Sequence, residues 1–527
     1  MLRDFHLPGR SPVIACDGMA ATSHPLATQA AVETLRAGGS AADAAVTAVA
    51  VLSVVEPHMT GIGGDCFCMV SKPDQPVWGY NGAGRSPQNL RRQAFAEQDT
   101  GYLAGESVHS VTVPGAIEAW AAILAAHGRF GLDRALAPAI RYAEQGFPVA
   151  PRIAWDWASQ ADRLRHDPGA ARHYLPDGRS PDVGDVVRLP ALAATLEQIA
   201  AQGPRTFYEG PIAEDIVATL TPRGSFLTLD DLSRHRGEEA VPIATNYRGL
   251  DILELPPSGQ GLTALILLNI LERFDLATLD PLGPERFHVA LEAARLAYAL
   301  RDRHIADPSH MRVSVPDLLD KGLAKNLADR INRSQRQAVA DVAAMESDTV
   351  YLAVVDRDRM AVSLINSLFS SFGSGICTED TGIMLHNRGA CFVLDAGHPN
   401  CIGPGKRPMH TIIPGMAMRD GRCAMPFGVM GAHYQPMGHA QVITNMVDYG
   451  MDVQAAIDGP RAFCVDAASV VERGVPPATI AGLQERGHDV VVAPRPWGGG
   501  QAIEIDWARG VLIGGSDPRK DGCALGY

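Results

Sequence analysis

The sequence predicts a layered α+β fold, in which helices and strands are grouped along the chain instead of alternating. Apolar residues at helical spacing dominate residues 25–55 and 113–344, whereas β-branched and apolar runs of strand length dominate from Thr349 onward. At 527 residues, the chain exceeds the size at which a single hydrophobic core stops growing. We therefore expect either two domains or one large layered unit built from two segments.

A glycine pair divides the N-terminal helical region. Residues 25–55 are rich in Ala, Leu and Val, and Gly38-Gly39 interrupts them. Glycines commonly end a helix, and Ser40 is a suitable N-cap for a second one. Residues 60–65, Thr-Gly-Ile-Gly-Gly-Asp, then lead into a predicted buried strand at 66–71.

Two glycine-containing stretches raise the question of nucleotide binding. The turn at 60–65 precedes a strand, whereas the dinucleotide fingerprint follows a strand and opens a helix. Near Gly405-Lys406 the phosphate-loop pattern fails, because Arg407 stands where Ser or Thr is needed. The sequence therefore predicts no nucleotide site.

The middle of the chain is mainly helical, and we expect it to form a helical layer or lobe around the functional site of the protein. A strand-like run returns only near residues 251–255. The clearest predicted helices are 116–126, 192–201, 262–274 and 284–303.

The character of the chain changes at Thr349. Residues 334–347 are polar and small, as suits an accessible segment. Residues 349–356 are β-branched and apolar, Arg357-Asp358-Arg359 makes a turn, and 360–365 form a second strand of a hairpin. Further strands are predicted at 382–385, 412–418, 423–429, 501–505 and 511–514, with a helix at 436–449.

Composition and charge are typical of soluble globular proteins. Hydrophobic residues make up 46% and charged residues 20%, and the longest apolar run, 44–55, is too short to span a bilayer. A net charge of −13 without any Lys/Arg-rich run disfavours nucleic acid as a partner. Residues 1–10 lack the apolar core of a signal peptide, so we expect a cytoplasmic protein without a membrane partner.

The nine cysteines predict neither a disulfide framework nor a zinc site. Their number is odd and no pair spacing repeats. Cys66 and Cys68, for example, lie in an apolar run, where a reduced cysteine packs as a small hydrophobic residue. We expect no metal.

Thr349 is a candidate nucleophile because of where it lies. A hydroxyl is a poor nucleophile until a base takes its proton, and a threonine can use its own α-amine, freed by backbone cleavage, as that base. Such a residue must begin a strand after a segment that can open, and Thr349 meets both conditions. Threonine also favours strand starts for structural reasons, so the local pattern leaves both interpretations open.

Six short motifs stand in order along nearly the whole chain. They are Glu56 to Gly64, Val113 to Gly115, Thr349 to Asp356, Phe372 to Ile376, Gly515 to Arg519, and Gly526-Tyr527. Together they resemble the γ-glutamyltransferase family of N-terminal-nucleophile hydrolases.

The resemblance implies a four-layer αββα sandwich and a proenzyme that cleaves itself between Asp348 and Thr349. Residues 1–348 would form a large, helix-rich subunit, and residues 349–527 a small, β-rich one that begins with the nucleophile. The two would make one layered catalytic unit, with two such pairs in a heterotetramer. Acyl transfer would run through a threonyl ester, without a metal or organic cofactor.

The resemblance also implies roles for four residues around Thr349. Gly431 and Ala432 match the family's glycine pair, whose backbone N–H groups stabilise the oxyanion, although the second glycine is Ala here. Ser367 matches a hydroxyl that hydrogen-bonds the freed α-amine. Arg85 matches an arginine that pairs with the substrate carboxylate.

The positions that bind a glutamyl group in the family are altered in this chain. Phe369 replaces a polar residue, Cys391 lies near an expected acidic one, and His410-Thr411 replace a serine pair. A buried α-ammonium group would lose its carboxylate partner. Phe369 and Arg388 therefore predict a different pocket.

We expect the substrate to be a small carboxylate-bearing amide without an amino group, and oxamate, cleaved to oxalate and ammonia, fits best. The alternatives within the family are a γ-glutamyltransferase or glutathione hydrolase, and a cephalosporin acylase-like amidase. The predicted substrate-binding residues are Arg85, Phe369, Arg388, His410 and Thr411.

Three readings outside this chemistry remain open. The Gly373-Ser374-Gly375 stretch lacks the spacing of a serine-hydrolase elbow. His433 and His439 are six residues apart, which does not place them on one helical face as metal ligands. A chain that fails to cleave would be a scaffold or a binding protein.

Overall fold

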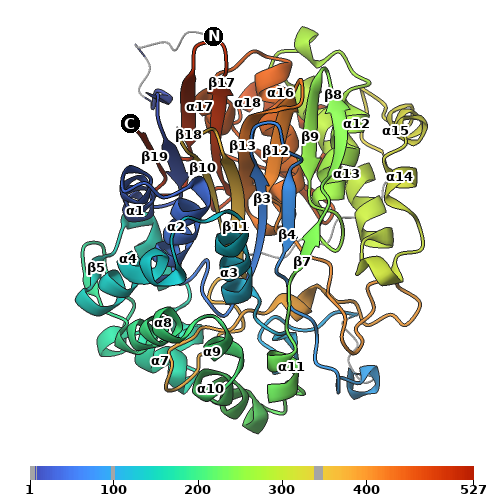
Figure 1. Cartoon of the computed structure of the whole chain (residues 1–527). Helices are drawn as coiled ribbons and strands as arrows, with labels where there is room; N and C mark the ends of the chain where they lie inside the picture. Colours follow the sequence, from blue (N-terminus) through green and yellow to red (C-terminus); the bar gives the residue numbers. More distant parts are fainter. Residues whose placement is uncertain (1–5, 7–8, 96–100, 338–347) are drawn as a thin grey trace.

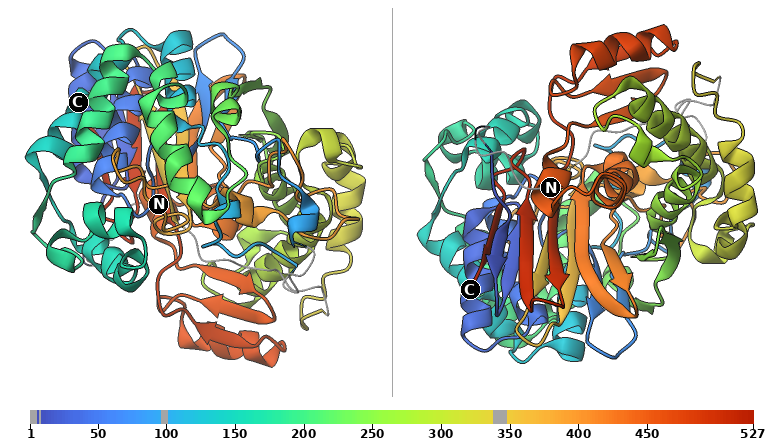
Figure 2. Two further views of the ribbon diagram at one scale, coloured as in Figure 1. Left: turned by 90° about the horizontal axis from the view of Figure 1, so that it is seen from below. Right: turned by 90° about the horizontal axis from the view of Figure 1, so that it is seen from above.

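In the computed structural model, two seven-stranded sheets lie face to face between helices (Figures 1 and 2). The structure describes residues 6, 9–95, 101–337 and 348–527, with the side chain of Asp348 left aside. All strand pairs of the two large sheets are antiparallel. The predicted αββα sandwich is confirmed.

The sheet that contains Thr349 combines strands from the N-terminal and C-terminal parts of the chain. Its central pair, β10 and β11, forms the predicted hairpin at Thr349, and β2 and β3 flank that pair. In spatial order the strands are β19 (Cys523–Gly526), β2 (Met19–Thr22), β10 (Asp348–Val355), β11 (Ala361–Phe369), β3 (Asp65–Ser71), β4 (Trp78–Asn81) and β7 (Glu238–Ala240).

The second sheet packs its inner face against the first, with β13 and β17 against β10. Its strands in spatial order are β1 (Val13–Ala15), β18 (Val511–Ser516), β17 (Gly499–Asp506), β13 (Arg422–Met430), β12 (Gly415–Arg419), β9 (Leu250–Glu254) and β8 (Ile243–Tyr247). Both sheets thus contain strands from before and after Thr349, which makes the two segments one packed unit.

Helices cover the outer face of each sheet. On the sheet that contains Thr349, α1 (Pro25–Arg36) and α2 (Ala41–Val55) lie against β2, β10 and β11, and α3 (Ala116–His127) lies against β3. On the other, α12 (Gly261–Leu271), α16 (Gln435–Val447) and α17 (Val453–Asp458) cover β8, β9, β13, β17 and β18. Ser40 caps α2 as predicted, in a capping box with Asp43.

The remaining helices surround this sandwich. They are α4 (Leu132–Gln145), α5 (Pro151–Ala158), α6 (Ala161–Leu164), α7 (Pro168–Tyr174), α8 (Pro190–Gln202), α9 (Arg205–Tyr208), α10 (Pro211–Leu220), α11 (Leu229–Ser233), α13 (Pro284–His304), α14 (Val315–Leu318), α15 (Lys321–Ala328) and α18 (Pro477–Glu485). A small sheet of β14 (Ala462–Val465), β15 (Ala468–Val471) and β16 (Val490–Val492) projects from the body with α18 (Figure 2). A two-stranded sheet joins β5 (Phe147–Pro148) and β6 (Val186–Val187).

Several predicted elements differ in the structure. Residues 382–385 form no strand, and Met384 makes one isolated bridge to Cys377 while Ile383 and Leu385 are buried against neighbouring loops. The strand predicted at 412–418 begins only at Gly415. Strands β7 and β8 also lie in the middle segment, where only one strand was predicted. Both are short and partly polar, so their sequences show little of the pattern expected of a strand.

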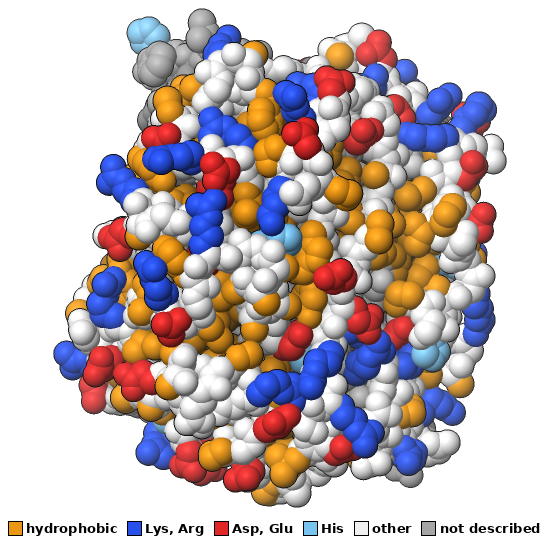
Figure 3. Space-filling view, in the orientation of Figure 1, with side chains coloured by type: hydrophobic (Ala, Val, Ile, Leu, Met, Phe, Trp, Pro, Cys, Tyr) orange, Lys and Arg blue, Asp and Glu red, His pale blue; other side chains and the backbone are white. Residues whose placement is uncertain are grey.

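The outer surface mixes charges of both signs. On the face shown in Figure 3, basic and acidic side chains are interspersed around scattered apolar groups. None of the helices within the described residues combines the length and apolar character needed to cross a membrane.

Candidate active site

Thr349 is the second residue of β10 and is wholly buried in the uncut chain. Asp348 pairs with Phe369 and Val350 pairs with Asn366, so the register between β10 and β11 shifts at Thr349. Such an irregularity turns a side chain away from regular alternation. Of the predicted accessible segment 334–347, residues 338–347 lie outside the described residues.

The structure brings Thr349 and Ser367 together. Their hydroxyl oxygens are 2.9 Å apart, and the Phe369 N–H donates to Ser367 Oγ at 2.8 Å. The glycine turn before β3 supports this end of β11, because a Cβ on Gly64 would lie 2.4 Å from the Ser367 carbonyl oxygen. Only glycine allows that close backbone approach.

Arg388 lies on the other side of Ser367 and is also wholly buried. Its guanidinium donates to Thr411 Oγ1 at 2.7 Å and to Ser367 Oγ at 3.3 Å, and it stacks 4.4 Å from the centre of the Phe369 ring. Burial lowers the pKa of this guanidinium. Among the described residues it has no carboxylate at ion-pair distance, and its Nε has no hydrogen-bond partner. Burying a cation without a carboxylate at ion-pair distance is costly, so Arg388 is a candidate partner for an anion.

His410 contacts Asp65. The His410 Nε2 lies 3.0 Å from Asp65 Oδ2, while the Ile412 N–H donates to its Nδ1. Burial, followed by the charge of Arg388, lowers the pKa of His410 to about 3, so the ring is neutral at pH 7. Its contacts fix the backbone that carries Thr411, and so the partner of Arg388.

Asp65 and His386 belong to the same group of contacts as His410, although the sequence pattern did not predict them. Burial alone would raise the pKa of Asp65, but His386 and His410 hold it well below its ordinary value. The Gly84 and Gly115 N–H groups also donate to Asp65 Oδ1. An acidic residue directly after the glycine turn was the only signal available in the sequence.

Gly431 and Ala432 form a left-handed turn at the end of β13. Their φ angles are 119° and 50°. Neither N–H donates a hydrogen bond to another described residue, which leaves both available to an oxyanion. Gln260 Nε2 donates at 2.8 Å to both the Ala432 and the Thr411 carbonyl oxygens, joining this turn to the segment that holds Arg388.

Replacing Ala432 by glycine should raise the free energy of unfolding by up to about 1 kcal/mol. A side chain in the left-handed region costs roughly 1–2 kcal/mol, and the greater freedom of glycine in the unfolded chain offsets part of the gain. Denaturant unfolding of the Ala432→Gly variant measures the effect. Ala440→Gly, within helix α16, is the control and should destabilise the protein. If Ala432→Gly were less stable than the parent protein, the left-handed backbone of Ala432 would not be strained.

Arg85 is half-exposed and already paired. It lies 2.9 Å from Glu238 and 3.1 Å from Asp307, and it donates to the Gly405 carbonyl at 3.2 Å. Its charge is therefore balanced within the chain, in contrast to that of Arg388.

The residues considered for a serine hydrolase or for a metal site have other partners. Ser374 donates to the Leu385 carbonyl at 2.8 Å. His433 contacts Arg301, whereas His439 contacts Glu254 at 2.6 Å. No group of three or more potential metal ligands occurs within residues 6, 9–95, 101–337 and 348–527.

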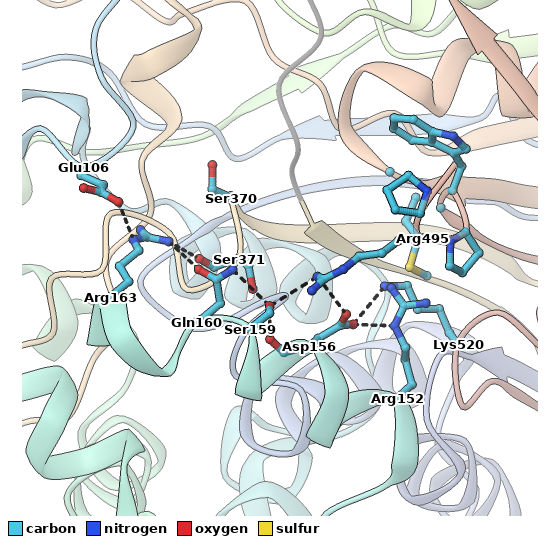
Figure 4. Close-up of a pocket in the computed structure, with 16 residues that line it drawn as sticks. Glu106, Arg152, Asp156, Ser159, Gln160, Arg163, Ser370, Ser371, Arg495 and Lys520 are labelled. Carbon is cyan, nitrogen blue, oxygen red and sulfur yellow. Dashed lines mark hydrogen bonds and ion pairs between the residues drawn. The ribbon is translucent and has the colours of Figure 1, made fainter. Parts of the chain in front are cut away.

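Two cavities lie beside these groups. One of about 290 Å³ is lined by Gly431 and by Ser370 and Ser371, which follow β11 (Figure 4). The other, of about 250 Å³, is lined by Ala390 and Cys391, two and three residues after Arg388, and by other residues that include Met409 and His433.

Acidification should destabilise the protein between about pH 6.5 and pH 3. Burial lowers the pKa of His410 to about 3, and that of His24 and His235 to about 4, from 6.5. In this window the unfolded chain binds more protons, so the free energy of unfolding rises with pH. Thermal unfolding at pH 5 and pH 7 tests this, with a lower midpoint expected at pH 5. His235→Asn should reduce the dependence and His166→Asn, at an exposed position, should not. Equal midpoints at both pH values would refute the prediction.

Comparisons with known proteins point to one family. Residues 27–527 match the family described as Gamma-glutamyltranspeptidase. The chain is 39% identical to the "Glutathione hydrolase-like YwrD proenzyme" of Bacillus subtilis (98% of this chain, 99% of that protein) and 37% identical to the "Oxamate amidohydrolase proenzyme" of Klebsiella pneumoniae (98% and 99%). The crystal structure of cephalosporin acylase from Bacillus halodurans has a TM-score of 0.93 at 40% identity, covering 100% of this chain and 99% of that one.

The names of these relatives are those of hydrolases that act on amide bonds, and their proenzyme names fit processing into two subunits. The chain therefore belongs to the γ-glutamyltransferase family of N-terminal-nucleophile hydrolases, and it is an enzyme that acts on amide C–N bonds.

Proposed function

We propose that the protein is a self-cleaving N-terminal-threonine amidohydrolase that converts oxamate into oxalate and ammonia. The choice of substrate rests on one observation, the buried guanidinium of Arg388, which has no carboxylate partner. It contacts the Ser367 hydroxyl, which in turn contacts Thr349. Oxamate places a carboxylate one bond from its amide carbonyl, which suits a cation so near the nucleophile. The 37% identical oxamate amidohydrolase supports this choice.

Self-cleavage precedes catalysis in this proposal. Thr349 Oγ1 attacks the Asp348 carbonyl carbon, the acyl group moves from nitrogen to oxygen, and water hydrolyses the ester. The products are a large subunit, residues 1–348, and a small one, residues 349–527, whose new α-amine is the general base. Ser367 is placed to orient that amine and the hydroxyl.

Substrate hydrolysis uses the same hydroxyl. The Thr349 α-amine takes the hydroxyl proton as Oγ1 attacks the amide carbon, and the Gly431 and Ala432 N–H groups stabilise the oxyanion. The nitrogen leaves with the proton held by the amine. Water then cleaves the threonyl ester, releasing oxalate and restoring the hydroxyl.

A glutamyl substrate fits this pocket less well. Its α-ammonium would face the Arg388 guanidinium, and like charges in a buried site repel strongly. The second candidate is an acylase for longer carboxylate-bearing acyl groups. The cavity of about 250 Å³ lined by Ala390 and Cys391 favours it, together with the likeness to a cephalosporin acylase.

Purified, processed enzyme should release ammonia from oxamate far faster than it releases p-nitroaniline from γ-glutamyl-p-nitroanilide. A coupled ammonia assay and absorbance at the nitroaniline band measure the two rates. A glutaryl amide, in which the carboxylate lies further from the amide, tests the second candidate in the same experiment. Rapid cleavage of the γ-glutamyl compound with no turnover of oxamate would overturn the proposal.

A further inference from the structure

The cavity of about 290 Å³ beside Gly431 is built from three parts of the chain that meet at the end of β11 (Figure 4). Helices α5 and α6 form one wall, Ser370 and Ser371 form a second, and residues 494–498 form a third. Because Gly431 is one of the two oxyanion donors, a substrate bound at Thr349 borders this cavity.

The cavity carries more positive than negative charge. Its lining contains four cationic side chains, Arg152, Arg163, Arg495 and Lys520, and two carboxylates, Asp156 and Glu106. Asp156 is shared, since it lies 2.7 Å from Arg152, 3.7 Å from Lys520 and 4.0 Å from Arg495. Glu106 lies 3.4 Å from Arg163 but is 74% exposed, so water screens its charge. The lining thus has a positive surplus beside the oxyanion donors.

Unsatisfied polar atoms point to a ligand with acceptor oxygens. Ser371 Oγ and Trp497 Nε1 are buried and have no hydrogen-bond partner among the described residues, and both residues line this cavity. The indole N–H can only donate, and the hydroxyl can also donate. Buried donors without partners cost free energy, and an anion with several oxygens would satisfy them.

Two of the cations that line the cavity stack on Trp155. The guanidinium carbons of Arg152 and Arg495 lie 5.0 Å and 4.9 Å from the ring centre of Trp155. Such cation–π contacts place both cations without neutralising them. Arg495 is 40% exposed and reaches the cavity from its open side.

We propose that this cavity binds a carboxylate on the leaving amine, so that the enzyme prefers N-oxalyl amino acids and peptides over simple oxamate. The inference rests on the proposed function. With the acyl carboxylate at Arg388 and the carbonyl oxygen at the Gly431 and Ala432 N–H groups, the amide nitrogen faces the remaining opening. Its substituent enters the cavity between Ser371 and Arg495.

The reaction balances as for oxamate. The C–N bond breaks as the Thr349 ester forms, the amino acid nitrogen takes the proton that the α-amine removed from the hydroxyl, and water releases oxalate from the ester. The products are oxalate and a free amino acid or peptide.

Two substrates that differ only in charge test the proposal. The processed enzyme should show a kcat/KM roughly tenfold higher for N-oxalylglycine than for its neutral isostere N-oxalylglycinamide, as a charged hydrogen-bond partner implies. Arg495→Gln should reduce this ratio several-fold, and Arg495→Glu should invert it. The control is Arg165→Gln, a half-exposed arginine outside the cavity that pairs with Asp162, and it should leave the ratio unchanged. A ratio near one in the parent enzyme, or one unaffected by Arg495→Gln, would overturn the inference.

A binding experiment separates this inference from the proposed function. Uncut Thr349→Ala protein should bind N-acetylglycine, but not N-acetylglycinamide, in saturation-transfer NMR, and Arg495→Gln should weaken that signal. If oxamate is not hydrolysed but this binding is seen, the proposed function fails and the subsite stands. If oxamate is hydrolysed and neither the ratio nor the binding depends on Arg495, the subsite fails alone.

Discussion

Thr349→Ala should be recovered as a single uncut chain without amidase activity. The substitution removes the oxygen that would attack both the Asp348 carbonyl and the substrate, so processing and turnover are lost together. The expected fall in kcat is at least ~10⁴-fold, since no other described hydroxyl shares the place next to Ser367. Denaturing electrophoresis and an ammonia assay measure the two losses.

Two further variants make the Thr349 result specific. Thr349→Ser keeps the hydroxyl, so it should cut itself and retain slower turnover, and the small fragment should begin Ser-Val-Tyr-Leu. Ser363→Ala removes a buried hydroxyl from the same strand pair, bonded to Tyr351 at 2.9 Å, and should process normally. If Thr349→Ala still yielded a fragment beginning at residue 349, Thr349 would not be the nucleophile of its own cleavage.

Local patterns in the sequence were enough to place the strand that begins at Thr349. The run from Thr349 to Asp356 is β-branched and apolar, and such a run forms a central strand wherever its partners lie. The same holds for β13 and β17, and for α2, whose cap at Ser40 depends on residues three apart. These features are decided over a few residues, so a single sequence contains the information.

The surroundings of Thr349 depend on contacts between distant parts of the chain, which no local sequence pattern predicts. Asp65 and His410 are 345 residues apart in sequence, and His410 reaches Asp65 from a segment that is bridged to Gly259. The residues at 382–385 were read as a strand because they are apolar, but packing alone buries them. Likewise, the carboxylates that balance Arg85 come from residues 238 and 307, and their approach is a property of the folded chain.

That last contrast decides which arginine should hold the substrate. The family resemblance assigns the substrate carboxylate to Arg85, whereas the charges in the folded chain favour Arg388. Arg85 would have to leave Glu238 and Asp307 to bind a substrate, but Arg388 gains its first anionic partner by doing so. A buried cation that acquires a hydrogen-bonded carboxylate gains several kcal/mol.

Arg388→Met should therefore lower kcat/KM for oxamate by roughly 10²- to 10³-fold, which corresponds to about 3–4 kcal/mol. Oxamide, in which a neutral amide replaces the carboxylate, supplies the comparison. The variant should lose much less activity on oxamide than on oxamate, because the hydrogen bonds of Arg388 to Thr411 and Ser367 are lost for both substrates and the charge–charge contact is lost only for oxamate. Fragment sequencing confirms that the variant is processed, so that the loss is one of substrate binding.

The Arg388→Met chain should also unfold at an equal or higher denaturant concentration. Removing an unpaired buried charge relieves its desolvation cost, and Met fills a similar volume over the Phe369 ring. Lower activity with undiminished stability would identify Arg388 as a residue kept for its ligand. If Arg85→Met instead abolished the preference for oxamate over oxamide and Arg388→Met preserved it, the carboxylate would belong to Arg85. The small acyl pocket proposed around Arg388 would then be wrong.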